Sequence, residues 1–147
     1  MKIGEFLKRS GQKLVVCLPD NPLNAVAKLM YTHNIGAMPV CEMGTRIVGV
    51  ISERDLVRAF ARTDLTELQY LRASDVMTTR VVSCEPNETM QTAQELMKTN
   101  HYRHLPIVKD GRVLGMLSLR DTVALRLRES EAEVNVLRDV AVTKRHF

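Results

Sequence analysis

Two stretches of the chain share one pattern and decide how the chain is organised. Residues 49–55 read GVISERD and residues 115–121 read GMLSLRD, so glycine, serine, arginine and aspartate recur in the same frame 66 positions later. In each stretch an apolar run precedes the serine, and a helix-favouring segment follows it. The pattern therefore predicts a junction between a strand and a helix that occurs twice in 147 residues.

The repeat extends outward from this motif over nearly the whole of each half. Val15-Val16 matches Val81-Val82 at the same offset of 66, and further matches fall at an offset of 67, which one single-residue gap on each side explains. The further matches are Pro19, Leu29, Met30, Thr32 and Pro39 with Pro86, Leu96, Met97, Thr99 and Pro106. The chain is thus predicted to hold two copies of one unit.

The sequence of each copy predicts strands and helices in the order β-α-β-β-α, which is an α/β (α+β) fold. The first copy supplies strands at 15–16, 37–41 and 47–51, a helix over 25–30 and a last helix from Glu53; the second supplies strands at 81–82, 104–108 and 113–117, a helix over 90–97 and a last helix from Leu119. Gly44 and Asp110-Gly111 predict the hairpin turns. We assign 1–61 to the first copy, 62–73 to a partly helical connector, 74–128 to the second copy and 129–147 to a helical tail. The copies are expected to pack sheet against sheet.

The shared motif allows two interpretations. Serine at a helix N-cap with an acid three residues later is a capping box, which satisfies orphan backbone donors. The double occurrence, the preceding glycine and the arginine beside each aspartate, which capping does not require, favour an anion site at the helix N-terminus. An aspartate one turn into the helix can also accept both hydroxyls of a ribose. Both interpretations remain open, and the serine can serve both.

On these motifs, and on residues 36–40 (GAMPV) and 103–107 (RHLPI), the chain resembles a CBS-domain pair over about residues 1–128. This family of regulatory modules is named after cystathionine β-synthase, and the chain is similar to its short stand-alone bacterial members. The resemblance implies a pseudo-twofold disc with two clefts for AMP, ADP, ATP, NAD or S-adenosylmethionine. It also implies a non-catalytic sensor that signals to an unknown partner protein and associates as a flat homodimer.

The resemblance assigns roles to particular residues. Asp55 and Asp121 would bind ribose hydroxyls, Ser52 and Ser118 ribose or phosphate, and Arg54 and Arg120 phosphate. The adenine slots would be lined by Val16, Ile35, Gly36, Ala37, Met38 and Pro39, and by Val82, Tyr102, Arg103, His104, Leu105 and Pro106. The first copy has the uncharged Ile35-Gly36-Ala37 where the second has Tyr102-Arg103-His104. We therefore expect unequal clefts, with Asp121 in the tighter, phosphate-dependent one.

Motifs and composition argue against other functional classes for this chain. No P-loop, dinucleotide-binding glycine motif or Ser-His-Asp set occurs, so neither an enzyme nor a catalytic cofactor is expected. A structural dimerisation module with vestigial clefts is one alternative, although both aspartates and both arginines are intact. Single-stranded nucleic-acid binding is the other, but the net charge is only +4, and 4% aromatic residues without tryptophan leave few stacking platforms.

The remaining features predict a cytoplasmic protein without a metal site. No apolar stretch is long enough to span a membrane, and no basic-then-apolar leader opens the chain. Cys17, Cys41 and Cys84 are expected to be reduced, at least partly buried thiols. His101 and His104 lead into a strand, where they would face opposite sides, so no metal is expected there.

The tail, Leu125 to Val140, is rich in glutamate and arginine and carries a short apolar stripe. The stripe runs through Val123, Leu127, Val134, Leu137 and Ala141, and Ser130 interrupts it. It is too short for an independent coiled coil. The tail is therefore expected either to fold back on the body or to form a contact with a second copy or another partner.

Overall fold

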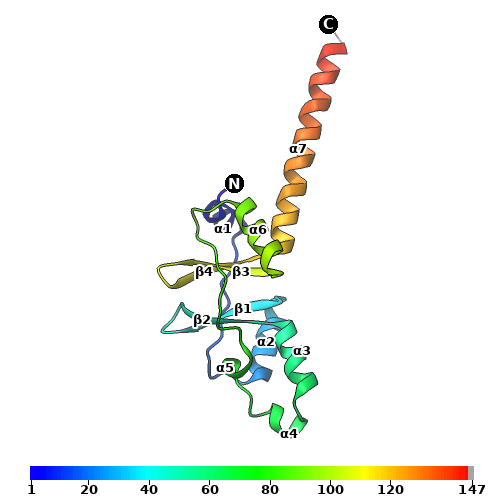
Figure 1. Cartoon of the computed structure of the whole chain (residues 1–147). Helices are drawn as coiled ribbons and strands as arrows, with labels where there is room; N and C mark the ends of the chain where they lie inside the picture. Colours follow the sequence, from blue (N-terminus) through cyan, green and yellow to red (C-terminus); the bar gives the residue numbers. More distant parts are fainter. Residues whose placement is uncertain (146–147) are drawn as a thin grey trace.

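The computed structural model describes residues 1–145, and its centre is one antiparallel sheet of four strands in the order β1-β2-β4-β3 (Figure 1). The strands are β1 (Ala37–Glu42), β2 (Arg46–Ser52), β3 (His104–Lys109) and β4 (Arg112–Ser118). Each copy contributes one hairpin, whose turn has two successive residues with positive φ: Met43 and Gly44 in the first copy, Asp110 and Gly111 in the second. This turn geometry matches the twist of the flanking strands and confirms the predicted hairpins.

The two hairpins meet through β2 and β4, where Arg46 pairs with Arg112. Backbone hydrogen bonds from Ile47 to Gly111 (3.2 Å) and from Val113 to Thr45 (2.9 Å) support this junction. The expectation of two separate sheets packed against each other is therefore wrong, because the strands of both copies form one sheet.

Helices cover the sheet within each copy. The predicted helices are present as α2 (Leu23–His33), α3 (Glu53–Arg62), α6 (Met90–Asn100) and the start of α7 (Leu119–Arg145). The connector is partly helical, as predicted, because it contains α4 (Leu65–Leu68); α1 (Ile3–Ser10) and α5 (Ala73–Val76) complete the described part of the chain.

The segment that opens each copy packs in the other half of the molecule. Ile3 and Phe6 of α1 belong to the core of the second copy, with Met97, Leu105 and Leu117. In turn, α5 contributes Ala73 to the core of the first copy, which also contains residues of α2, β1 and β2. Backbone hydrogen bonds fix both exchanges, from Gly4 to Pro86 (2.8 Å) and from Ala73 to Asn21 (2.8 Å). Figure 1 shows α1 beside α6, in the half that holds β3 and β4.

The predicted first strands at 15–16 and 81–82 are absent. Only Cys17 and Cys84, one and two residues further on, form single parallel bridges, to Val40 and Ile107. Cys17 donates its N–H to the Pro39 carbonyl (3.1 Å) and accepts the N–H of Cys41 (2.8 Å). A longer parallel ladder would need an N–H on Pro39, which proline lacks. Pro106 likewise lacks the N–H that would extend the parallel ladder beyond the bridge of Cys84.

The three thiols are free and buried, as expected. Burial raises the pKa of Cys17 and of Cys41 to about 11 and the pKa of Cys84 to about 12. These cysteines are therefore protonated at neutral pH and unreactive.

The tail does not fold back on the body. The tail is the outer part of α7, a single helix of 27 residues that projects away from the sheet (Figure 1). Within the repeat, α7 is the counterpart of α3. No helix of residues 1–145 combines the length and the apolar character needed to cross a membrane.

Candidate ligand-binding cleft

A cleft of about 440 Å³ lies at the boundary between the two copies. The first copy lines it with the end of β2, the start of α3 and Gly36-Ala37 before and in β1. The second copy lines it with Tyr102, Arg103, His104 and Pro106 around the start of β3. Residues 78–82, which cross between the halves, supply Thr78, Arg80, Val81 and Val82. Its volume lies in the range of small-molecule sites, about 300–1,000 Å³.

Ser52 and Asp55 form a complete capping box at the first turn of α3. The Asp55 Oδ2 accepts the backbone N–H of Ser52 (2.8 Å) and its hydroxyl (3.0 Å), and the Asp55 N–H donates to Ser52 Oγ (3.4 Å). The other oxygen, Oδ1, lies 3.5 Å from the Arg58 guanidinium. Asp55 is 9% exposed, and it still lines the cleft. The carboxylate therefore caps the helix with one oxygen, while the other lies next to Arg58, which also lines the cleft.

Arginines from three segments make the cleft cationic. Arg54 and Arg58 come from α3, Arg80 from the crossing segment and Arg103 from the loop before β3. Glu53 is the acid that accompanies Asp55 in the lining. Four guanidinium groups against two carboxylates favour an anionic ligand, and guanidinium groups bind phosphate in a bidentate manner.

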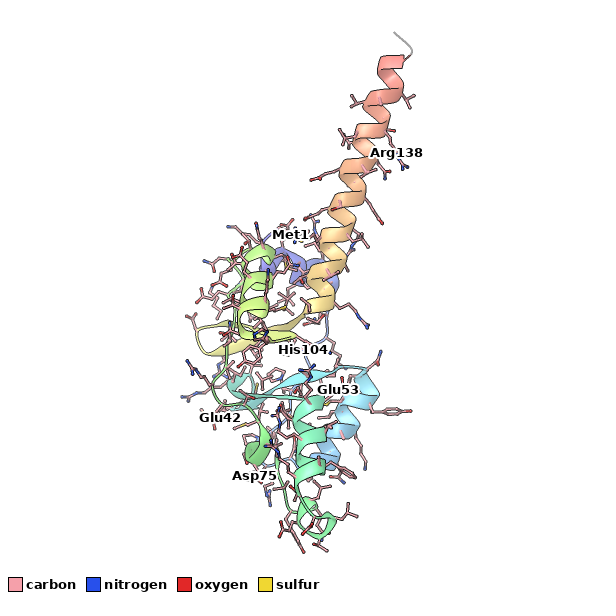
Figure 2. All side chains as sticks on the ribbon, turned by 45° about the vertical axis from the view of Figure 1, so that its right-hand side comes forward. Met1, Glu42, Glu53, Asp75, His104 and Arg138 are labelled. Atoms are coloured by element: carbon pink, nitrogen blue, oxygen red, sulfur yellow. The ribbon has the colours of Figure 1, made fainter. Side chains whose placement is uncertain are left out.

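His104 lies on the opposite side of this boundary from Glu53 (Figure 2). A Cβ atom built on Gly36 would lie 3.4 Å from His104 Cε1 and would overlap the Glu53 carboxylate, so Gly36 leaves room for both side chains. Burial lowers the pKa of His104 below its usual value, while Glu53 and Asp121 act against this shift and Arg103 adds to it. The imidazole is therefore neutral at pH 7 in the ligand-free protein, and it can donate or accept a hydrogen bond.

The sequence pattern that defines the CBS domain matches residues 3–62 and again residues 73–127. The chain belongs to the CBS domain family. It is 32% identical over 114 residues to the CBS domain-containing protein YhcV of Bacillus subtilis, a match that covers 78% of this chain and 79% of that protein. In three curated relatives the match spans 65%, 79% and 69% of the relative's own length.

Solved structures of CBS proteins have the same fold. The CBS-domain protein ATU1752 from Agrobacterium tumefaciens superposes with a TM-score of 0.78 and 33% identity, covering 86% of this chain and 99% of that one. The CBS domain pair of protein MJ0100, whose structure is a complex with 5-methylthioadenosine and S-adenosyl-L-methionine, superposes with a TM-score of 0.77 at 20% identity and covers 88% and 98% of the two chains. At that identity the likeness shows the fold alone.

The cleft brings together just over half of the residues that the sequence singled out. These are Gly36, Ala37, Ser52, Arg54, Asp55, Val82, Tyr102, Arg103, His104 and Pro106. The others lie outside its lining: Val16, Ile35, Met38, Pro39, Leu105, Ser118, Arg120 and Asp121. Met38 and Leu105 are fully buried in the cores of the two CBS motifs.

The cleft combines an acid of the first CBS motif with charged residues of the second. We expected Asp121 to share a cleft with Arg103 and His104, the charged residues of its own CBS motif. Instead Asp55 of the first motif lines the cleft together with them. Ser118 and Asp121 form the equivalent cap on α7, with 2.9 Å from Ser118 N to Asp121 Oδ2 and 3.1 Å from Asp121 N to Ser118 Oγ. The two CBS motifs thus share one capping geometry, and only the first motif's cap opens into this cleft.

Four polar lining residues were missed in the sequence: Glu53, Arg58, Thr78 and Arg80. A comparison of the two CBS motifs could have found Arg58, because Ala124 stands at the matching position 66 residues later and the arginine is therefore specific to the first motif. Thr78 and Arg80 lie outside the repeated motif, in the crossing segment near the start of the second copy. Their contribution depends on how that segment crosses the boundary, for which the sequence carries no signal.

Proposed function

We propose that this protein is a non-catalytic regulatory module that binds an adenosine nucleotide in the cleft between its CBS motifs and signals to a partner protein. The observation that carries the proposal is the position of Asp55. Its Oδ1 lies beside Arg58 while Oδ2 caps α3, and both residues line the cleft, so a carboxylate and a set of arginines lie around one cleft.

The cleft offers a complementary group for each part of a nucleotide. Val82, Ala37 and Pro106 supply apolar surface for a base, and Tyr102 adds an aromatic ring. Asp55 supplies the acceptor for ribose hydroxyls. The arginines of α3, with Arg80 and Arg103, supply the charge for phosphate. AMP, ADP, ATP and NAD(H) all contain this combination of base, ribose and phosphate.

The fold relative MJ0100 supports the same class of ligand, because both molecules named in its complex contain adenosine. The cleft residues support a phosphate in addition. Four arginines lining one cleft carry more positive charge than a neutral nucleoside requires.

A ligand in this position would link the two halves of the molecule. Asp55 and Arg58 belong to the first CBS motif, and Arg103 and His104 belong to the second. A ligand that contacts both motifs changes the relative stability of their arrangements by its differential affinity, which is the physical requirement for signalling. We propose that a partner protein, or a second copy in a homodimer, reads this change.

The proposal is tested with protein that has been unfolded, freed of small molecules and refolded. Melting temperatures are then measured with AMP, ADP, ATP, NAD, NADH and S-adenosylmethionine. A ligand at a hundred times its dissociation constant adds about 2.7 kcal/mol. For a domain of this size we expect a rise of roughly 5–10 °C with at least one nucleotide. If none of these compounds raises the melting temperature, nucleotide sensing is rejected and a structural role is favoured.

A further inference from the structure

The outer part of α7 presents an apolar face that contacts nothing in the body. The helix is anchored at its base, where Thr122 is 3% exposed and Leu125 packs against the core of the second CBS motif. Beyond this base the helix stands alone (Figure 1), and its residues from Arg126 to Val142 are exposed. The exposed apolar side chains include Val123, Leu127 and Leu137, at 51%, 59% and 68%.

These side chains follow the spacing of a coiled-coil seam. The positions Val123, Leu127, Ser130, Val134, Leu137 and Ala141 alternate intervals of four and three residues. This interval averages 3.5 residues, at which apolar side chains keep facing a partner helix. Leu127 and Val134 occupy one core position of the heptad, and Val123 and Leu137 the other. We call this face the seam.

The seam faces away from the body. At about 100° per residue, Thr122 lies roughly 100° around the helix from Val123, and Leu125 lies roughly 160° from it. The two side chains that pack on the body are therefore turned from the seam, which stays open along its length. A partner helix can lie against it without contacting the sheet.

The charges that flank the seam select the partner and its direction. Arg126 and Glu133 lie along one edge of the seam, and Glu131 and Arg138 lie along the other. In two parallel helices in register, each residue of the first edge lies next to the residue five positions further on in the other chain. Arg126 then meets the partner's Glu131, and Glu133 meets the partner's Arg138. Twofold symmetry doubles these matches to four pairs of opposite charge.

An antiparallel pair gives fewer matches. In the register that centres on residue 132, Glu131 meets its own copy and Glu133 meets its own copy, which places like charges together. In the register that places Val134 opposite Leu137, only Glu131 and Arg138 match, and Glu133 meets the partner's Val140. The charge pattern therefore favours a parallel pair, and Leu137 at one core position with Val134 at the other is a combination found in two-stranded coiled coils.

We infer that α7 pairs with α7 of a second copy of this chain in a parallel, two-stranded coiled coil. The two CBS bodies then lie on opposite sides of a two-helix stalk. The first turn of a free helix is costly to form in water. Here the body fixes the first turns of α7, so the costly nucleus of the helix is already formed. This inference is independent of the proposed nucleotide site.

The oligomeric state of the full chain tests the inference. Sedimentation velocity is expected to give twice the chain mass of 16.6 kDa for the unmodified protein. Leu137→Glu is expected to halve the observed mass, because it places two carboxylates in the seam. Val136→Glu is the matched control, since Val136 is similarly exposed at 61% but lies off the seam. Circular dichroism confirms that both variants retain their helix. A monomeric parent, or a dimer that Leu137→Glu leaves intact while Phe60→Glu on α3 disrupts it, would overturn the inference.

A charge exchange tests the pairing without altering the apolar seam. Glu131→Arg should raise the dissociation constant of the dimer about tenfold, because two matched pairs become repulsive. Adding Arg126→Glu should restore the parent affinity, whereas Glu129→Arg, the same change away from the seam, should have no effect. Rescue by Arg138→Glu in place of Arg126→Glu would show antiparallel helices and contradict the inferred direction.

A single cysteine reports the direction directly. Ser130 occupies a core position, so two copies of Ser130→Cys face each other in a parallel pair and should form a disulfide-linked dimer under oxidised glutathione. The three natural cysteines are buried and give little background. A cross-link that forms only when Ser130→Cys is mixed with Ala141→Cys would contradict the parallel arrangement.

Discussion

Asp55 uses its two oxygens for different purposes. Oδ2 completes the capping box with Ser52, and Oδ1 lies 3.5 Å from Arg58. The sequence alone offered capping and binding as alternatives, because both interpretations rest on the same serine and aspartate. The structure shows the capping geometry in both CBS motifs, while only Asp55 lines the cleft. Which of the two aspartates lines the cleft depends on tertiary packing, so the motif alone could not predict it.

Arg58 is replaced by Ala124 at the matching position of the second CBS motif, and its guanidinium predicts that ligand binding depends on phosphate. Arg58→Ala should weaken AMP binding about tenfold, the lower end for a charge-assisted hydrogen bond, because its side chain is 57% exposed. Binding of adenosine, which lacks the phosphate, should change little. Calorimetric titration of both ligands measures the difference. Arg62→Ala, at the end of α3 and outside the cleft lining, is the control; an equal loss for adenosine would show that Arg58 supports the cleft and does not bind phosphate.

His104 predicts a dependence of stability on pH. Because burial lowers its pKa in the folded protein, the unfolded chain binds more protons between that lowered value and about 6.5. The free energy of unfolding should therefore fall as the pH drops below about 6.5 and should recover above it. His104→Gln should remove this part of the pH dependence, and His33→Gln on the surface should retain it. Urea unfolding at several pH values measures the slopes, and equal slopes for His104→Gln and the parent would refute the assignment.

The elements of the hairpins and their helices follow closely from the sequence. The predicted strands at 37–41, 47–51, 104–108 and 113–117 match β1 to β4 within one residue, because apolar strand pattern, turn residues and caps agree there. The first strands failed because Pro39 and Pro106 cannot extend the ladder. The exchange of α1 and α5 between the halves was also missed, because local pattern carries no information on which copy a short helix packs against.

The exchange of α1 and α5 predicts which half of the molecule a substitution in α1 destabilises. Phe6 is 9% exposed in the core of the second CBS motif, so Phe6→Ala should lower the free energy of unfolding by about 3–5 kcal/mol. Phe60→Ala, at a site 64% exposed on α3, should cost far less. Hydrogen exchange by mass spectrometry locates the effect. We expect faster exchange in α6 and β3 with α2 and β1 unchanged; the reverse distribution would mean that α1 packs on its own copy.

The repeat predicted two similar halves but not the cleft that they form together. Motif comparison placed Asp121 with Arg103 and His104, since they share one copy. Asp55 lines this cleft together with Arg103 and His104, because the cleft lies at the boundary and takes residues from both sides. The continuous α7 was predicted in its helical character but not in its direction, which depends on the absence of a body surface beside its outer turns.

A comparison of the two aspartates gives a direct test of nucleotide binding in this cleft. Asp55→Ala and Asp121→Ala each remove the carboxylate that accepts the N–H of the N-cap serine, so both should lower the free energy of unfolding by a similar amount, about 0.5–1.5 kcal/mol. Only Asp55 lines the cleft. Calorimetric titration with the nucleotide that stabilises the parent should therefore show at least a tenfold loss of affinity for Asp55→Ala and a clearly smaller loss for Asp121→Ala. Parent-like binding by Asp55→Ala, in a protein that melts as Asp121→Ala does, would reduce the motif to a pair of helix caps and contradict the proposed function.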